Sequence, residues 1–306
     1  MAEITVIGSF VMDSVAVMSR FPIDGETVSG NSIAFYPGGK GANQCVSIAR
    51  LGGDVEMCGM LGKDDNGKRF IGILEKEGIK HDHVFFCDVS TAVAQIQIDG
   101  KGENRICVIP SANYKFGMEE VEKIDGLIRK TELIVLQLEL PLETVCEIIR
   151  RAKKYGTMIL LNPAPAVKLN DDILAGIDYL TPNEHELTTL TGLPVNSLDE
   201  IEHACKFLHR KGIKNVITTL GPRGAFVVND HLCELVAGYK VKAVDTVGAG
   251  DSFNGALAVK ITERSGLKDA IRFANAMGAL TVQIKGAIPS LHYKKEVNEF
   301  LEEQNS

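Results

Sequence analysis

The sequence predicts an α/β protein, with an open, mostly parallel sheet flanked by helices and a small β-sheet lid. The first observation behind this prediction is that short apolar runs alternate regularly with amphipathic stretches from Met118 onward. Repeated strand and helix units are typical of a parallel sheet with helices on both faces. The second observation is that residues 15–36 and 84–109 follow a period of two, with turn residues between the runs. This pattern favours antiparallel hairpins, which we expect to join as the lid.

Length and composition are compatible with one large domain. The chain has 306 residues and a hydrophobic content of 45%, which is enough to bury a single large core. No internal repeat or low-complexity segment interrupts it. We therefore expect one domain over residues 1–306, with the core at about 1–10, 38–83 and 110–306 and the lid at about 11–37 and 84–109.

Charge and cysteine content narrow the class of protein. Lys and Arg number 33 against 40 Asp and Glu, the net charge is −7, and there is no long basic run, so a nucleic-acid surface is not indicated. The seven cysteines form no CxxC pair and mostly occupy apolar positions, as reduced thiols do. No basic segment leads into an apolar run near Met1, and no stretch reaches transmembrane length. We expect a cytoplasmic protein without a membrane partner.

The N-terminal part supplies a strand and a glycine-rich helix start. Ile4–Ile7 is apolar and ends at Gly8, and open α/β sheets bind ligands at such strand ends. Asp13 follows five residues later. Pro37–Asn43 then opens a helix, so its glycines would direct backbone N–H groups at a ligand, although an ordinary helix start with a solvated lysine has the same pattern. The alternation continues through a strand at 55–61 and a helix at 67–77.

The rest of the chain continues the alternation. Glu139 directly follows a predicted strand, where a carboxylate can receive hydroxyl groups, although a solvated loop acid would look the same. Asn183 and Glu186 lie three residues apart on one face of a helix turn; on spacing alone they are a helix cap and a first-turn acid. We expect helices at 118–130, 142–155, 198–211 and 267–283, and strands at 133–138, 158–161, 177–180, 216–220 and 225–228.

The stretch Asp245–Gly255 combines a glycine turn, two carboxylates and a helix start. Small and apolar residues after Gly250 predict a buried helix whose first turn is residues 248–250. Unpaired N–H groups at the positive end of a helix make an anion site. Asp251, at the edge of that site, could accept a proton from a hydroxyl that attacks a phosphate. The alternative is a glycine turn with an Asp helix cap.

Two motifs, in the correct order, resemble the signatures of the ribokinase (PfkB-type) family of carbohydrate kinases. The C-terminal one is Asp245-Thr-Val-Gly-Ala-Gly-Asp-Ser-Phe-Asn-Gly255, and the N-terminal one is Gly38-Gly-Lys-Gly-Ala-Asn-Gln44 followed by Ala49-Arg-Leu-Gly52. The resemblance runs from about residue 4 to residue 290 and includes Gln137-Leu-Glu139 and Leu161-Asn-Pro-Ala-Pro165. It implies a ribokinase-like fold and an ATP-dependent pentose kinase that phosphorylates the 5-hydroxyl of D-ribose.

The resemblance also implies roles for individual residues. Asp251 would be the general base, and the N–H groups of Gly248, Ala249 and Gly250 would form the anion hole for the γ-phosphate. The positions that match the sugar site are Val11, Met12, Asp13, Gly39, Lys40, Gly41, Asn43, Glu139 and Asp251. The positions that match the nucleotide site are Asn183, Glu186, Thr219, Leu220, Gly221, Pro222, Arg223, Gly224, Gly250 and Asn275.

The sequence also leads us to expect bound metal ions and a second subunit. The resemblance implies ATP bound with Mg²⁺, and K⁺ as a monovalent activator. The positions that match the cation site, several through backbone carbonyls, are Asp245, Val247, Thr281, Ile284, Gly286 and Ser290. We expect a homodimer formed through the lid, because isolated hairpins leave unpaired backbone at their edges that another subunit could cover.

One position departs from the family pattern. Where ribokinases have Gly-Ser-Ile-Asn-Ala-Asp, this chain has Gly8-Ser-Phe-Val-Met-Asp13, which places Val11 at the position of the Asn. In the family this side chain lies near the sugar 2-hydroxyl. An apolar residue there resembles the related deoxyribokinases and removes a hydrogen bond that ribose would use. The chief alternative substrate is therefore 2-deoxy-D-ribose.

Functions of other classes have less support. A nucleoside kinase of the same fold is a further alternative. A dinucleotide-dependent dehydrogenase needs Gly-x-Gly-x-x-Gly directly after the first strand, and residues 8–13 do not have it. A non-catalytic sugar sensor would require the loss of the base, and Asp251 is present. The sequence also lacks a His-x-x-x-His pair and a Gly-x-Ser-x-Gly elbow, which argues against zinc and covalent hydrolase chemistry.

Overall fold

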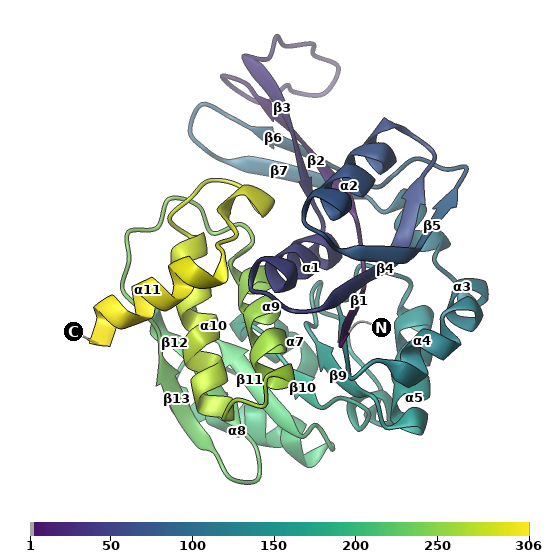
Figure 1. The fold of residues 1–306 in the computed structure, drawn as a ribbon. Helices are drawn as coiled ribbons and strands as arrows, with labels where there is room; N and C mark the ends of the chain where they lie inside the picture. Colours follow the sequence, from purple (N-terminus) through teal and green to yellow (C-terminus); the bar gives the residue numbers. More distant parts are fainter. Residues whose placement is uncertain (1–2, 306) are drawn as a thin grey trace.

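The computed structural model describes residues 3–305, so the first two residues and the last one of the predicted domain lie outside this range. Within it, nine strands form one sheet in the order β13-β12-β11-β10-β9-β8-β1-β4-β5, and four strands form a second, separate sheet (Figure 1). The strands of the large sheet are β1 (Ile4–Ile7), β4 (Val55–Gly62), β5 (Lys80–Cys87), β8 (Leu133–Leu136), β9 (Met158–Leu161), β10 (Tyr179–Leu180), β11 (Asn215–Thr219), β12 (Gly224–Val228) and β13 (Cys233–Ala237).

The large sheet is parallel from β5 to β11 and antiparallel at one edge. β1 lies between β4 and β8, and Ile4 is in register with both Val55 and Leu133. These central strands are buried along their whole length and mostly apolar because helices cover them on both faces, as in other parallel sheets. The strands β12 and β13 add antiparallel pairs beyond β11. The predicted open, mostly parallel α/β sheet is therefore confirmed.

Helices cover the two faces of this sheet in two groups. Apolar residues such as Val46, Phe253 and Ile271 pack one group on the first face, and residues such as Ile148 and Leu208 pack the other group on the second. The first group is α1 (Lys40–Arg50), α2 (Asp65–Lys76), α9 (Ala249–Thr262), α10 (Leu267–Thr281) and α11 (Lys294–Asn305). The second group is α3 (Met118–Lys123), α4 (Asp125–Lys130), α5 (Leu142–Tyr155), α6 (Asp171–Leu174), α7 (Glu184–Thr191) and α8 (Leu198–Arg210).

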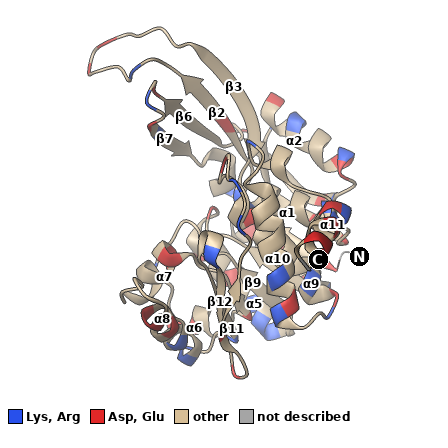
Figure 2. Ribbon diagram, turned by 90° about the vertical axis from the view of Figure 1, so that its left-hand side faces the viewer, with Lys and Arg blue, Asp and Glu red and all other residues tan. Residues whose placement is uncertain are grey.

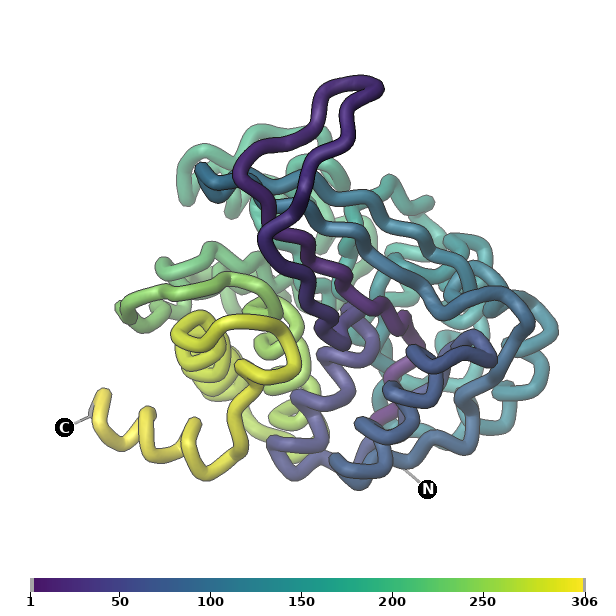
Figure 3. The backbone as a smooth tube through the Cα atoms, turned by 90° about the horizontal axis from the view of Figure 1, so that it is seen from above, coloured from purple at the N-terminus to yellow at the C-terminus, as the bar shows by residue number. Residues whose placement is uncertain are grey.

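The smaller sheet has the order β3-β2-β6-β7 and extends away from the carboxyl ends of the parallel strands (Figures 1 and 3). Its strands are β2 (Val11–Val17), β3 (Ser32–Gly38), β6 (Val93–Ile98) and β7 (Asn104–Ile109). The two hairpins are antiparallel within themselves and are joined by a parallel pairing of β2 with β6. The predicted small lid sheet is therefore confirmed, and we call these four strands the lid.

Several predicted boundaries were wrong. Residues 84–87, which we assigned to the lid, belong to β5 and pair with β4 at the edge of the large sheet. An edge strand has one exposed face, so it shows the same period of two as a hairpin. The single helix expected at 118–130 divides at Ile124 into α3 and α4. The strand expected at 177–180 is only two residues long.

Charged residues of both signs are interspersed on α2 and α11, while the lid strands are mostly uncharged (Figure 2).

Among residues 3–305, no helix is both long enough and apolar enough to cross a membrane.

Candidate active site

The described part of the chain contains two adjoining pockets at the carboxyl ends of the parallel strands. The first, of about 520 Å³, lies between the lid and the starts of α1 and α9. The second, of about 430 Å³, lies between the β11–β12 turn, α9 and α10. Thr219, Thr246 and Gly250 line both pockets, so the two lie on either side of these residues. A molecule in one pocket can therefore meet a molecule in the other beside Gly250. We call them the lid pocket and the helix pocket.

The start of α1 forms part of the lid pocket. Gly39 precedes the helix with φ +88°, and a Cβ there would lie 2.6 Å from the backbone nitrogen of Val11. Only glycine fits this left-handed position so close to another chain segment. The turn brings Lys40 and Asn43 to the pocket lining. The buried Asn43 Oδ1 has no hydrogen-bond partner among the described residues, while Asn43 Nδ2 is bonded to Asp251.

Two carboxylates, Asp13 and Glu139, also line the lid pocket. Asp13 and Val11 are on β2 two residues apart, so both side chains point to the same face of the lid. Burial, together with the negative charge of Glu139, raises the pKa of Asp13 to about 6. Glu139 accepts a hydrogen bond from Ser9 Oγ and one of 3.0 Å from the backbone N–H of Lys40. The loop after β8 is thereby fixed to the start of α1.

The ammonium group of Lys40 is the positive charge of this site. Burial favours the neutral amine, but three carboxylates outweigh burial and raise the pKa of Lys40 above its usual value; they belong to Asp251, Glu139 and Glu186. A protonated lysine can donate to hydroxyl or phosphate oxygens. The lid pocket therefore holds one ammonium group among four carboxylates, those of Asp13, Glu139, Glu186 and Asp251.

Asp251 lies in the first turn of α9 and is buried. Gly248 precedes the helix with φ +81°, a left-handed conformation that glycine adopts without strain. The carboxylate of Asp251 accepts hydrogen bonds from Asn43 Nδ2 at 2.8 Å and from Gln44 Nε2 at 3.0 Å. The starts of α1 and α9 therefore meet at this carboxylate, beside the N–H groups of the α9 first turn.

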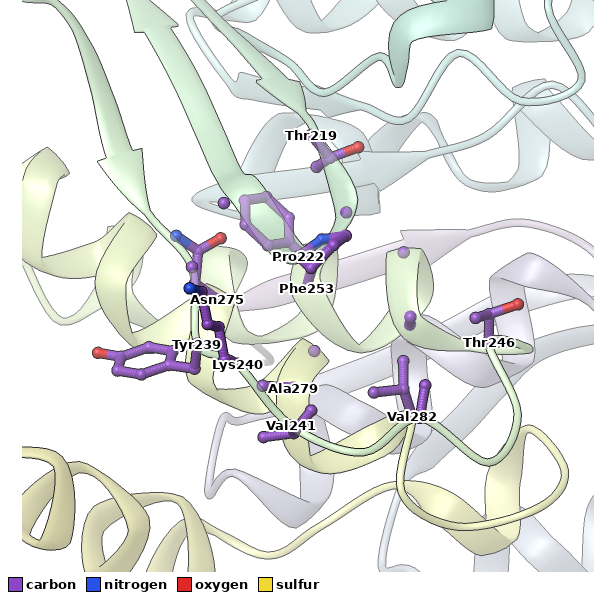
Figure 4. A pocket seen from close by; sticks show the side chains of 17 residues that line it. Thr219, Pro222, Tyr239, Lys240, Val241, Thr246, Phe253, Asn275, Ala279 and Val282 are labelled. Atoms are coloured by element: carbon purple, nitrogen blue, oxygen red, sulfur yellow. The ribbon is translucent and has the colours of Figure 1, made fainter.

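The helix pocket has a mainly apolar lining (Figure 4). Phe253, Ala279 and Val282 contribute side chains from α9, α10 and the residue after α10. Asn275, which is buried, donates through Nδ2 to the backbone oxygens of Val236 and Ala237. With both amide hydrogens used, Oδ1 is the polar atom that Asn275 can offer to a molecule in this pocket.

Asn183 and Glu186 cap the start of α7 at the edge of the lid pocket. Glu186 accepts hydrogen bonds from the backbone and side-chain nitrogens of Asn183, both at 2.9 Å, and donates its own N–H to Asn183 Oδ1. Burial raises the pKa of Glu186 in spite of these bonds and of nearby Lys40. The carboxylate and amide oxygens at this edge are of the kind that Mg²⁺ prefers.

The segment before α9 is joined to the loop after α10. Asp245 accepts hydrogen bonds from the backbone N–H groups of Val247 and Gly286, at 3.1 and 2.9 Å. Ser290 donates to the backbone oxygen of Ala287 and is buried. The predicted cation-site positions in residues 245–247 and 284–290 are therefore neighbours in space, directly before the first turn of α9.

Most of the predicted site residues gather in the two pockets. Those of the sugar site that line the lid pocket are Val11, Asp13, Gly39, Lys40, Asn43, Glu139 and Asp251. Those of the nucleotide site that line the helix pocket are Thr219, Gly221, Pro222, Gly224, Gly250 and Asn275.

Four residues of the predicted sugar and nucleotide sites line neither pocket. Met12 alternates with Val11 and Asp13 along β2, so its side chain is buried in the core. Gly41 is buried inside α1, and its backbone approaches Gly8. Leu220 is buried, and Arg223 instead pairs with Glu184 at 2.6 Å. Sequence position alone had grouped these residues with neighbours that do face the pockets.

The sequence analysis missed further pocket residues. Asn162, Thr181 and Asn254 are buried polar residues of the lid pocket, and Thr181 Oγ1 donates to Asn254 Oδ1 at 2.6 Å. Segment 238–246 lines the helix pocket without any recognisable pattern. A buried Asn or Thr at a strand end is a signal that could have found Asn162 and Thr181, whereas Asn254 lies inside α9.

The fold and these two pockets define an enzyme that brings two small molecules together at a carboxylate and a glycine-rich helix start. Comparisons with known proteins agree. Residues 1–294 match the pfkB family of carbohydrate kinases. The chain is 38% identical over 300 residues to a ribokinase from Haemophilus influenzae and 36% identical over 301 residues to a deoxyribokinase from Salmonella typhi, each alignment covering 98% of both chains. A ribokinase from Arabidopsis thaliana, solved with ribose and ATP, superposes with a TM-score of 0.90 at 31% identity and 98% coverage of both chains.

The chain therefore belongs to the pfkB family of carbohydrate kinases. The protein is a carbohydrate kinase, and the ribokinase-like fold predicted from the two glycine motifs is confirmed.

Proposed function

We propose that this enzyme transfers the γ-phosphoryl group of ATP to the 5-hydroxyl of D-ribose to give ribose 5-phosphate, with 2-deoxy-D-ribose as the alternative substrate. The observation that supports it most directly is the position of Asp251, which lines the lid pocket beside Gly250, where the two pockets join. The named function of the relatives that match this chain over nearly their whole length agrees with it. In this proposal, residues 3–305 act as one catalytic domain, and the lid forms one wall of the sugar pocket.

In this reaction, the sugar occupies the lid pocket and the nucleotide occupies the helix pocket. The 5-hydroxyl oxygen bonds to the γ-phosphorus, the bond from that phosphorus to the ADP oxygen breaks, and the hydroxyl proton goes to Asp251. Lys40 and the N–H groups of residues 248–250 stabilise the charge on the transferring group. Asp13, Asn43 and Glu139 receive the sugar hydroxyls. The mainly apolar helix pocket, with Asn275 Oδ1 as an acceptor, suits a base that carries an amino group.

Magnesium would bind beside the phosphates, and Asn183 and Glu186 are the residues that would hold it. Within residues 3–305, no three His, Cys, Asp or Glu side chains group closely enough to hold a metal ion on their own. Mg²⁺ in proteins is usually bound by only one or two carboxylates, and its other ligands are water molecules and substrate phosphate oxygens. The Glu186 carboxylate and the Asn183 amide oxygen therefore fit this ion. Held by these residues, the ion would supply positive charge beside the phosphate oxygens.

Potassium is expected to raise kcat several-fold above the value in sodium. Of the proposed ligands of this cation, residues 245–247 directly precede the first turn of α9, and residues 281 and 284–290 lie where the chain after α10 is hydrogen-bonded to that segment. A well-fitted ion would therefore order the N–H groups that face the phosphate. The measurement is the turnover rate at constant ionic strength in KCl, NaCl and choline chloride. Equal rates in the three salts would remove the cation-site assignment.

The preferred sugar is the subject of a further prediction, which also tests the proposed function. Val11 is an apolar neighbour of Asp13 in the lid pocket. An apolar wall rejects an added hydroxyl by only about 10²-fold, whereas a site built to hydrogen-bond that hydroxyl rejects an analogue without it by about 10⁴-fold. We expect kcat/KM for 2-deoxyribose to equal or exceed that for ribose, and Val11→Asn to shift the ratio toward ribose.

The measurement is ATP consumption with ribose, 2-deoxyribose, other pentoses and nucleosides, in the wild type and in Val11→Asn. Val11→Leu is the matched control, because it changes size without adding a hydrogen-bonding group. A preference for ribose by several orders of magnitude that Val11→Asn leaves unchanged would show that Val11 is not beside the 2-hydroxyl. If only nucleosides are phosphorylated, the substrate is a nucleoside and not a free pentose.

We also propose that the enzyme is a homodimer joined through the lid. On the pocket-facing side of the lid, Ile96 pairs with Ile106 and Ala94 pairs with Val108, and Ile106 and Val108 are each 57% exposed. Apolar side chains exposed on a sheet commonly mark an interface. Light scattering at micromolar concentration should give twice the chain mass, and Ile106→Asp should give monomers; a monomeric wild type would contradict the proposal.

A further inference from the structure

Two buried glutamines form a chain of hydrogen bonds behind Asp251. Gln44, on α1, donates from Nε2 to Asp251 Oδ1 at 3.0 Å and to Asn162 Oδ1 at 3.2 Å. Gln137, directly after β8, donates from Nε2 to Gln44 Oε1 at 2.6 Å. The exposed fraction is 0% for Gln44 and 1% for Gln137, and neither residue lines a pocket. Neither has a part in the reaction described above.

The ionised carboxylate determines which way both amides point. A carboxylate only accepts hydrogen bonds, so Gln44 must present its NH₂ group to Asp251 and its Oε1 to Gln137. Gln137 must then present its own NH₂ group to Gln44. The chain ends at Gln137 Oε1, a buried acceptor without a partner among the described residues. A buried acceptor of this kind is costly, which indicates that the bonds toward Asp251 outweigh it.

Gly8 leaves the space in which Gln137 sits. A Cβ on Gly8 would lie 2.2 Å from Gln137 Oε1 and 2.8 Å from the Cα of Gly41. Any other residue at position 8 would therefore push the Gln137 amide away from Gln44. The first strand, which ends at Gly8, thereby takes part in holding the amide chain.

The two oxygens of Asp251 differ in their surroundings. Oδ1 is held from the buried side by Gln44, whereas Oδ2 is bonded by Asn43, which lines the lid pocket. A hydroxyl in that pocket can replace Asn43 Nδ2 at Oδ2 without disturbing Oδ1. Oδ2 is therefore the oxygen that can receive the proton.

We propose that Gln44 is a positioning residue for phosphoryl transfer, oriented by Gln137, which fixes the Asp251 carboxylate with Oδ2 toward the acceptor hydroxyl and favours its ionised form. This inference rests on the proposed role of Asp251 as the base. A hydrogen bond donated to a carboxylate stabilises the charged form, so the loss of that bond favours protonation. The other charged groups that act on Asp251 are Lys40, from α1, and Glu186, from α7, and the variants below leave both in place.

The test is the pH profile of kcat/KM for Gln44→Met, in which a side chain of similar length lacks the donor. A hydrogen bond to a charged group corresponds to about one to two pH units, so the acidic limb should move to higher pH by that amount. On the acidic limb, kcat should fall about tenfold or more relative to the wild type at the same pH and recover at high pH, while the KM values stay within about threefold. Gln137→Met and Gly8→Ala should act in the same direction but by less, because Gln44 is still present.

Ser47→Ala is the matched control. Ser47 is equally buried on α1 and contacts α9 through the backbone oxygen of Ser252 at 3.4 Å, but it does not touch Asp251. In Ser47→Ala, the acidic limb of kcat/KM should stay at the same pH as in the wild type. If Gln44→Met fails to fold, the double variant Gln44→Met/Gln137→Met removes both partners of the inner bond, which is the less disruptive change.

An acidic limb unchanged in Gln44→Met and in the double variant, with normal thermal unfolding, would overturn the inference. A shift of the same size in Ser47→Ala would also overturn it, because the effect would then come from general packing. The proposed function has a separate readout: if Asp251→Asn keeps its turnover, Asp251 is not the base, whatever Gln44 does.

Discussion

Asp251→Asn should lower kcat by about 10² to 10⁴-fold, which is the range that general bases typically contribute. The amide has nearly the shape of the carboxylate but cannot take the proton of the attacking hydroxyl. Since Asp251 does not line the helix pocket, the affinity for ATP should stay within a few fold of the wild type. Turnover under saturating substrates and calorimetric titration with ATP measure the two quantities separately.

The control for this variant is its stability. Asn43 and Gln44 both donate to the carboxylate of Asp251. In Asp251→Asn, the new amide oxygen can accept from one of these donors, but the new NH₂ group then faces the other donor. Thermal unfolding should therefore show a folded protein with a somewhat lower Tm. Turnover near the wild-type rate in a folded Asp251→Asn would contradict the proposed mechanism.

Asp13→Asn should weaken sugar binding and stabilise the fold at the same time. Loss of a hydrogen bond to a charged group should raise the KM for the sugar by about 10- to 100-fold. The folded protein, in contrast, no longer carries a buried carboxylate close to that of Glu139. We expect a gain of about 1–2 kcal/mol in the free energy of unfolding at pH 8, reduced from the full shift because Asp13 is only partly buried.

The pH dependence identifies the cause of this stabilisation. The pKa of Asp13 is raised from 3.8 to about 6 on folding, so the folded state binds this proton more tightly than the unfolded state. The contribution of the protonated carboxyl is fully present below about pH 4 and is lost as the pH rises through 6. The Tm difference between Asp13→Asn and the wild type should thus be clear at pH 8 and small at pH 4. A difference that does not vary with pH would contradict this explanation.

The sequence predicted the structure best where a short motif requires particular residue types. The glycine turns before α1 and α9 were predictable, because Gly39 and Gly248 adopt backbone conformations that few other residues accept. The side chains that follow each turn, Lys40 and Asp251, were therefore correctly expected at pockets. The alternation of strands and helices also follows from apolar patterns that every parallel sheet requires.

Other parts depended on contacts between distant segments, which one sequence does not reveal. The period of two in β5 arises from an edge position in the large sheet, and nothing local distinguishes it from a lid hairpin. The amide of Gln44 meets Gln137, 93 residues further along the chain, and Asn162, 118 residues away. Segment 238–246 lines a pocket through its position beside α10 and not through its composition.

The close packing of α1 on α9 has a consequence for how this enzyme can change its substrate. A Cβ on Gly255 would lie 2.5 Å from the Ser47 side chain, so the two helices are in direct contact just behind Lys40 and Asp251. The parts that handle the phosphoryl group thus form one rigid block, whereas Val11, Ala94 and Ile96 reach the acceptor from a separate sheet. In the proposed mechanism, part of the contacts to the acceptor therefore belongs to the lid, whereas Asn43 and Glu139 belong to the larger unit. Evolution, or a protein engineer, can exchange residues of the lid to admit a new sugar while the phosphate-handling block stays intact.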